Sequence, residues 1–323
     1  MKTTLRLFYF VTLLSLLAFP LAACGGTPQV GTSGELEGTV AISGAFALYP
    51  MMTRWGEEFQ KENPKVQFDI SAGGAGKGMA DALSNAVDIG MVSRDITPEE
   101  EGKGAFWVAV VKDAVFPTIN AKNPVLQDLL KKGATQETLV GIFITGEVKT
   151  WGQVVGRPEV TDEIHVFTRS DACGAAEVWA KYLGGKKQED LLGVAVFGDP
   201  GLLDAVVKDP LGIGYNNLNY AYDMKSGQPV AGAAILPIDK NGDGQADADE
   251  LIETKGEAVQ AVASGKYPSP PARALNLVTN GKPSGVVKAF IEWILTKGQQ
   301  YVGEAGYIQL TQEQLDASQQ KLK

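Results

Sequence analysis

The sequence predicts an α/β protein built on largely parallel sheets. Short apolar runs that are typical of strands alternate along the chain with the periodicity of amphipathic helices, and this alternation indicates α/β architecture. Several Gly- and Ala-rich turns follow a strand and open a helix. Residues 24–323 number 300 of the 323 in the chain, which is enough for two ordinary domains.

The expected elements follow one another in a regular order. Strands are expected at 38–43, 66–70, 87–91, 105–111, 114–119, 139–144, 164–168, 233–238 and 274–279. Helices are expected at 51–62, 78–85, 175–183, 202–208, 250–264 and 284–296. Parallel strands need long crossover connections, and these helices supply them.

The N-terminal segment has the pattern of a secretory signal. Lys2 and Arg6 precede an apolar run over 7–21, which is too short and too interrupted for a membrane span. The run ends in Leu21-Ala22-Ala23-Cys24, which resembles the lipobox of bacterial lipoproteins. We therefore expect a signal peptide at 1–23, lipidation of Cys24 and a flexible tether at 24–35; an ordinary signal peptide is the alternative. The protein is then exported and held at the cell envelope by its lipid anchor only.

Composition excludes several classes of function. The net charge of −9 argues against nucleic acid, because binding to the phosphate backbone needs a basic surface. His165 is the only histidine and is expected to pack within its strand. No nucleophile elbow and no Cys/His zinc spacing is present. We therefore expect neither an enzyme nor an organic cofactor.

Three loops are candidates for binding an anion. Each follows a strand and opens a helix, where free N–H groups and the positive end of the helix dipole attract negative charge. Small residues let a ligand approach the backbone. The candidate ligand-binding residues in these loops are Ala45, Phe46, Ala47, Gly74, Ala75, Gly76, Lys77, Asp171, Cys173, Gly174 and Ala175.

Two arginines complete the candidate site. Arg94 and Arg169 both follow apolar strands, where the ligand crevice of an open α/β sheet lies. A guanidinium offers a two-pronged fork to an oxyanion. The alternative is that each arginine pairs structurally with a neighbouring carboxylate, Asp95 or Asp171.

Several stretches, in order along nearly all of the chain after the signal, resemble the phosphate-binding protein of ABC phosphate importers. They are Ile42-Ser43-Gly44 through Tyr49-Pro50, the turn at 73–78, Val87-Asp88-Ile89-Gly90-Met91-Val92-Ser93-Arg94, Arg169-Ser170-Asp171, Gly212-Ile213-Gly214-Tyr215 and Gly306-Tyr307-Ile308-Gln309-Leu310. The resemblance implies a type II periplasmic-binding-protein fold with the ligand between two hinged lobes. On this basis lobe 1 is expected at 36–113 plus 275–323 and lobe 2 at 114–274, with crossovers near 112–118 and 272–277. It also implies a monomer that delivers phosphate to an ABC permease.

The ligand loops depart from that family. Ser and Thr hydroxyls typical of the family are replaced by Ala45, Phe46, Ala47, Ala75, Cys173 and Ala175. Each lost hydrogen bond to a charged ligand is worth about 1.5–3 kcal/mol. The alternatives for the ligand are therefore another oxyanion or a small carboxylate. The alternative for the function is a calcium-stabilised surface scaffold without a role in transport.

Cys173 has two possible roles. Its expected place at a helix N-terminus near Arg169 lowers a thiol pKa and could make it reactive or a weak donor to ligand. The favoured interpretation is a small buried residue that fills the pocket wall.

An acidic loop at 239–250 matches the EF-hand calcium pattern. Oxygen ligands are expected from Asp239, Asn241, Asp243, Gln245 through its carbonyl, Asp247 and Glu250, while Gly244 allows the sharp turn. A strand is expected before Asp239, so the loop lacks the paired helices of a sensor. We expect structural calcium here; an acidic turn without metal is the alternative.

Overall fold

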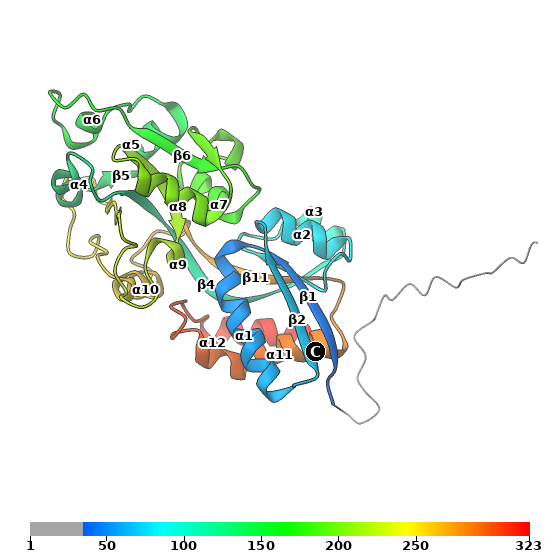
Figure 1. Ribbon diagram of the computed structural model, residues 1–323. Helices are drawn as coiled ribbons and strands as arrows, with labels where there is room; N and C mark the ends of the chain where they lie inside the picture. Colours follow the sequence, from blue (N-terminus) through cyan, green and yellow to red (C-terminus); the bar gives the residue numbers. More distant parts are fainter. Residues whose placement is uncertain (1–34) are drawn as a thin grey trace, which may run out of the picture.

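The computed structural model describes residues 35–323 and shows two lobes joined by extended strands (Figure 1). One buried core draws its residues from 40–111 and 275–322, and we call this part lobe 1. The second core comes from 114–267, with Ile308 added, and forms lobe 2. The predicted signal peptide, Cys24 and most of the tether lie outside the described residues.

Lobe 1 is an α/β layer whose strands are ordered β2-β1-β3-β11-β4. The first three strands run parallel to one another, whereas β11 is antiparallel to its neighbours. Its strands are β1 (Gly38–Gly44), β2 (Val66–Ala72), β3 (Ile89–Val92), the first part of β4 (Ala105–Asn120) and β11 (Ala272–Asn280). Its helices are η1 (Phe46–Leu48), α1 (Tyr49–Glu62), α2 (Ala75–Leu83), α3 (Pro98–Gly102), α11 (Gly285–Ile294), η4 (Lys297–Tyr301) and α12 (Gln312–Leu322).

Lobe 2 continues the same sheet in the order β4-β8-β6-β7, with β9 also paired to β4. Its strands are β5 (Ala134–Thr135), β6 (His165–Arg169), β7 (Val194–Val196), β8 (Gly212–Asn217), β9 (Ala233–Ile235) and β10 (Ile238–Asp239). Its helices are α4 (Leu126–Lys132), α5 (Gln136–Val140), η2 (Gly141–Thr145), α6 (Trp151–Val155), α7 (Gly174–Tyr182), η3 (Gln188–Asp190), α8 (Gly198–Lys208), α9 (Leu218–Ala221) and α10 (Lys255–Ala263).

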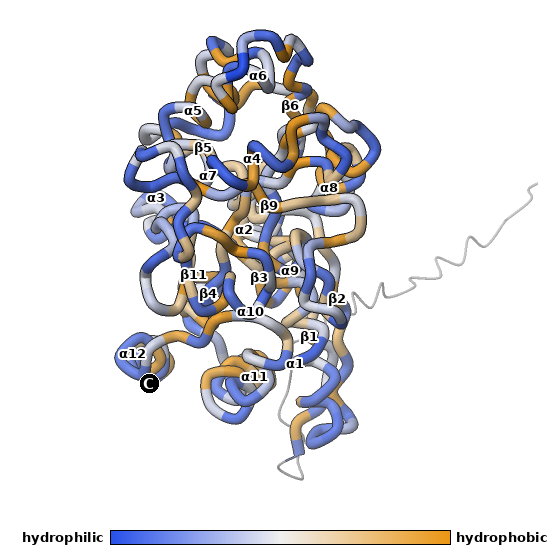
Figure 2. Tube along the Cα trace, turned by 90° about the vertical axis from the view of Figure 1, so that its left-hand side faces the viewer, coloured by the Kyte–Doolittle hydropathy of each residue, from blue (hydrophilic) through white to orange (hydrophobic). Residues whose placement is uncertain are grey.

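The two lobes are connected through β4 and β11. Strand β4 pairs with β11 up to Ala114 and with β8 from Val115 onward, so one strand passes from the first core into the second. In the side view, the C-terminal helices α11 and α12 lie at the opposite end of the molecule from α6 (Figure 2). No helix among residues 35–323 has the length and apolar character needed to cross a bilayer.

The predicted α/β fold class is confirmed, but some elements differ. The run 139–144 was expected as a strand and is helical, because Thr135 caps the first turn and Leu139, Ile142 and Phe143 are buried at helical spacing. The two strands expected at 105–111 and 114–119 form the single strand β4. The helix expected from residue 250 begins only at Lys255, where Thr254 forms a capping box.

Candidate functional site

The three candidate loops meet between the lobes. The carbonyl of Gly44 accepts hydrogen bonds from the N–H groups of Gly73 at 2.8 Å and Gly74 at 3.0 Å, which ties the first two loops together. The N–H of Gly76 then donates across the cleft to the carbonyl of Ala172, at 3.0 Å. The loops therefore touch directly: the first two follow the neighbouring parallel strands β1 and β2, and the third reaches them from β6 in lobe 2.

Glycine is required where the lobes approach most closely. Gly74 has φ +93°, and a Cβ there would lie 2.8 Å from a carboxylate oxygen of Asp171. A Cβ on Gly174 would lie 2.2 Å from the carbonyl oxygen of Ser93 in lobe 1. These contacts are shorter than atoms tolerate, so a side chain at either position would push the lobes apart.

Arg169 is buried at the centre of the site and held by two carboxylates. Its Nε and Nη2 donate to the two oxygens of Asp171 at 2.8 and 2.6 Å, and its Nη1 donates to Asp199 at 2.6 Å. Burial acts to lower the pKa of Arg169, but its neighbours, with Asp199 first and Asp171 among them, together outweigh burial and raise the pKa. The pairing with Asp171 that the sequence left open is thus present, and Asp199 was not anticipated.

An aromatic ring covers Arg169 from the lobe 1 side, and aromatic residues of lobe 2 contact the residue that carries that ring. The ring of Phe46 lies over the guanidinium, with 5.3 Å from its centroid to Cζ. Phe197, which is 63% exposed, meets Phe46 edge-on at 5.8 Å. Tyr220 donates to the Phe46 carbonyl at 3.3 Å. Phe46 thus connects lobe 1 to the charged centre of lobe 2.

Arg94 lies at the mouth of the cleft and not beside Arg169. It pairs with Glu100 at 2.6 Å in lobe 1 and with Glu177 at 3.1 Å in lobe 2. The side chain of Asp95, the partner weighed from the sequence, binds Lys181 instead at 2.9 Å. A cavity of about 510 Å³ opens between these residues and residues 185–189. Arg94 therefore joins the two lobes at their rim.

The remaining loop residues supply a mostly apolar lining. Ala45, Ala47, Ala75 and Ala175 are each at most 2% exposed. Lys77 is half-exposed and pairs with Asp81, so its ammonium does not replace a lost hydroxyl between the loops.

Cys173 is buried, as favoured from the sequence, whereas His165 is not packed as expected. Cys173 caps α7, where its Sγ accepts from the N–H of Ala176, yet burial raises its pKa to about 12. The thiol is therefore not activated, and the interpretation of a buried wall residue is the one that fits. His165 is not packed: its side chain is 47% exposed and its Nδ1 lies 2.7 Å from Asp209.

Further polar residues at the hinge were not found from the sequence. Arg273 of β11 donates to the carbonyl of Ser93 at 3.1 Å and to the side chain of Asn217, and lies 3.4 Å from Asp113. All of these residues are buried. They join strands far apart in the chain, so no local pattern marks them. Among the polar residues that were missed, only Asp199 could have been found from a pattern in the sequence. Gly198-Asp199 opens a helix after an apolar strand, as the three candidate loops do.

Asp113 gives the hinge a dependence on pH. Burial raises the pKa of Asp113 from its ordinary 3.8 to about 6, since leaving water costs more than the attraction of Arg273 returns. The folded state then binds a proton that the unfolded state has lost, so stability falls as pH rises from about 4 to about 6, by ~3 kcal/mol. Thermal melts of the wild type and of Asp113→Asn over this range should show that the decline is absent from the variant. Parallel curves would contradict this role.

The acidic loop lies in lobe 2, away from the cleft. The carboxylate of Asp239 accepts from the N–H groups of Gly242 at 2.7 Å and Gly244 at 3.0 Å, and Glu250 accepts from Lys240 at 2.7 Å and Asp247 at 3.1 Å. Gly244 has φ +77°, as the sharp turn requires. Within residues 35–323, however, no group of three or more His, Cys, Asp or Glu side chains is arranged to hold a metal ion. Calcium therefore stays a prediction.

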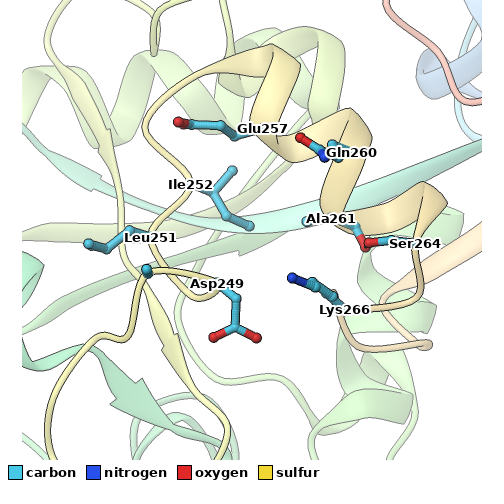
Figure 3. Close-up of a pocket in the computed structure, with 9 residues that line it drawn as sticks. Asp249, Leu251, Ile252, Glu257, Gln260, Ala261, Ser264 and Lys266 are labelled. Carbon is cyan, nitrogen blue, oxygen red and sulfur yellow. The ribbon is translucent and has the colours of Figure 1, made fainter.

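A pocket of about 290 Å³ adjoins this loop (Figure 3). Asp249 and Lys266 lie on one side of it, while Glu257 and Gln260 project from α10. None of the residues proposed for the anion site lines it, so it is separate from the cleft.

Comparisons with known proteins bear on this arrangement. The family model of the PBP superfamily domain matches residues 26–297. The chain is 28% identical to the phosphate-binding protein PstS of Bacillus subtilis over 315 residues, which is 93% of this chain and 94% of that protein. It is 26% identical to PstS of Methanocaldococcus jannaschii, over 91% and 88% of the two chains.

Solved structures agree on the fold. A putative phosphate ABC transporter substrate-binding protein from Clostridium perfringens with bound phosphate superposes with a TM-score of 0.69, at 24% identity, over 85% of this chain and 100% of that one. An ABC-type phosphate transport receptor from Vibrio cholerae gives 0.60 at 18% identity, over 84% and 100%. The predicted periplasmic-binding-protein fold is therefore confirmed.

Proposed function

Because the chain belongs to the PBP superfamily, whose domain spans residues 26–297, we propose that it captures phosphate outside the cytoplasm for an ABC importer. The observation that carries the proposal is a charged guanidinium buried where Gly-rich loops of both lobes meet. The full-length similarity to phosphate-binding proteins supports the choice of ligand. The role is binding and delivery, without catalysis.

Capture works by closure of the two lobes. Lobe 2 supplies Arg169 and the N-terminal turn of α7, and lobe 1 supplies Phe46 and the N-terminal turn of α2. An anion bound between them contacts both lobes only when they are closed, so it favours the closed state by that difference in affinity. The buried residues around Asp113 and Arg273 lie where β4 and β11 pass between the lobes and would form the hinge.

A different anion is the second candidate. The alanines that line the loops offer no hydroxyl donors, and two carboxylates already neutralise Arg169. Both features weaken binding of a multiply charged oxyanion relative to a small carboxylate. A scaffold without transport function is the remaining alternative.

Calorimetric titration of residues 25–323 tests these options. Saturable 1:1 binding of phosphate, stronger than that of sulfate, nitrate or acetate, is expected. Stronger binding of acetate than of phosphate would mean that the ligand is a carboxylate, while the proposed role in import would stand. No binding to any of these anions would overturn the proposal of capture.

We also propose that the protein is exported as a monomer anchored by lipid on Cys24. The charged start, apolar run and lipobox-like ending of residues 1–24 support this. Mass spectrometry of the mature N-terminus would detect the acyl chains. Light scattering would measure the molar mass of the particle, which should be that of one chain. An unmodified N-terminus would contradict the anchor.

We further propose that the loop 239–250 binds calcium for stability. Its spacing supplies only oxygen ligands, which suit a hard cation, and its first and last carboxylates are buried within the loop. Calcium would replace the backbone N–H groups that now occupy Asp239 and Glu250, so these side chains would have to turn toward a common centre.

Calcium is expected to raise the melting temperature by about 3 °C or more over the chelated protein. Calcium at ten times its dissociation constant adds ~1.4 kcal/mol to the free energy of unfolding. The melting temperature of a domain of this size rises by 2–4 °C for each kcal/mol. Differential scanning calorimetry in 10 mM calcium and in EDTA measures the shift. Glu250→Gln should abolish it, whereas Glu253→Gln, outside the loop, should not. An equal shift in both variants would place the ion elsewhere.

A further inference from the structure

We propose that Asp199 is a residue that limits the affinity of the site by competing with the incoming anion for Arg169. It would weaken the binding of oxyanions and set the affinity of the site. The inference rests on the proposed function, since it concerns the same cleft. Asp199 is 1% exposed and lies outside the three loops that the sequence singled out.

The contacts of Asp199 divide between its two oxygens. Oδ1 accepts from the backbone N–H of Asn217 at 3.2 Å and from its side chain at 2.8 Å, which fixes the carboxylate to β8. Oδ2 is left to face Arg169, and accepts from Nη1 at 2.6 Å. The carboxylate also sits in the first turn of α8, where the helix dipole favours negative charge. Asp199 is therefore held in place independently of Arg169.

The donors of Arg169 are largely consumed as a result. A guanidinium has five N–H donors, and Asp171 and Asp199 accept from all three of its nitrogens. Asp171 occupies the edge formed by Nε and Nη2. Three of the five donors are thus occupied. An oxyanion held by the remaining edge, between Nη1 and Nη2, would bind the same Nη1 that donates to Asp199 and would lie close to that carboxylate.

The charge balance adds to this competition. Two buried carboxylates face one guanidinium, so the immediate surroundings of Arg169 carry an excess negative charge. The nearby pair of Asp113 and Arg273 does not offset it, because the two have opposite charges. An entering anion therefore meets repulsion from Asp199 as well as competition for its donor. In a low-dielectric site such repulsion is stronger than at the same distance in water.

Asp199→Asn tests the inference with little change in shape. The amide oxygen can still accept from Asn217, while Nδ2 takes the place of the oxygen that faced Nη1, so both the negative charge and the acceptor beside Nη1 are gone. Phosphate is expected to bind about tenfold to a hundredfold more tightly, the gain that corresponds to removing one charge a few ångströms from the ligand. Calorimetry with inorganic phosphate on residues 25–323 gives the dissociation constants. Asp204→Asn, which removes an exposed charge from the same helix, is the matched control and should bind as the wild type does.

The outcomes are distinguishable. Tighter binding by Asp199→Asn alone supports the inference, since loss of a structural contact would not increase affinity. Equal or weaker binding by Asp199→Asn, with a wild type that binds, overturns the inference and leaves phosphate capture intact. If neither wild type nor variants bind phosphate, the proposed function fails and this inference with it. If Asp199→Asn does not fold, Asp199→Ser is the second variant to test. If neither variant folds, Asp199 is a structural residue, and the proposal that it competes with the anion for Arg169 is overturned.

Discussion

Arg169→Met is expected to abolish measurable phosphate binding and to lower the melting temperature by about 10 °C. The substitution keeps the length of the side chain but leaves Asp171 and Asp199 buried without a cation. Removing one partner from a buried ion pair costs ~3–5 kcal/mol, and a domain of this size loses 2–4 °C per kcal/mol. The ligand loses its only deeply buried positive partner within the three loops, which weakens binding at least about a hundredfold. Calorimetry and thermal melts measure both effects.

Two comparisons separate charge from fork geometry. Arg169→Lys retains the charge but offers a compact ammonium in place of the two-pronged guanidinium. Compared with Arg169→Met, it should therefore restore more of the melting temperature than of the affinity for phosphate. Arg157 is a matched control in lobe 2, because it pairs with Asp128 and Glu159 at the surface. Arg157→Met should change neither quantity appreciably. Undiminished phosphate binding by Arg169→Met would show that the ligand lies elsewhere.

The sequence predicted where the site lies because the relevant signals are local. A strand followed by a small-residue turn and a helix is visible within about ten residues, and ligand crevices lie outside the carboxyl ends of such strands. The loops at Gly44 and Gly74 follow neighbouring parallel strands of lobe 1, and the loop at Gly174 meets lobe 1 from the other side of the cleft. The placement of Arg169 followed from the same rule.

The electrostatics of the site could not be predicted, because they depend on distant partners. Asp199 reaches Arg169 from 30 positions further along the chain. Arg273 contacts Ser93 across 180 positions and Asn217 across 56. No periodicity records such pairings, so the sequence offered the neighbouring Asp171 as a partner of Arg169 but not Asp199.

One local prediction was wrong because the deciding contact lay outside the stretch from which it was drawn. The apolar run at 139–144 suggested a strand, but Thr135 upstream caps a helix there. For Cys173, the helix start acts to lower the thiol pKa and burial acts to raise it. Burial raises the pKa, which agrees with the favoured interpretation of a buried wall residue.

Gly174→Ala is expected to hold the lobes apart and to weaken phosphate binding about thirtyfold. The new Cβ would lie 2.2 Å from the carbonyl oxygen and 2.5 Å from the hydroxyl of Ser93, which belongs to the other lobe. The clash exists only in the closed arrangement, so it raises the free energy of the closed state alone. A penalty of ~2 kcal/mol on the closed state lowers its population, and with it the apparent affinity for phosphate, about thirtyfold. Each lobe keeps its own core, so the melting temperature should change little. Small-angle X-ray scattering at a phosphate concentration near the wild-type dissociation constant would report a larger radius of gyration than in Gly201→Ala, whose Cβ meets nothing within 4 Å. Identical affinity and scattering in the two variants would mean that phosphate capture does not require the contact between Gly174 and Ser93, and the closure mechanism would then have to rest on the rim pair of Arg94 and Glu177.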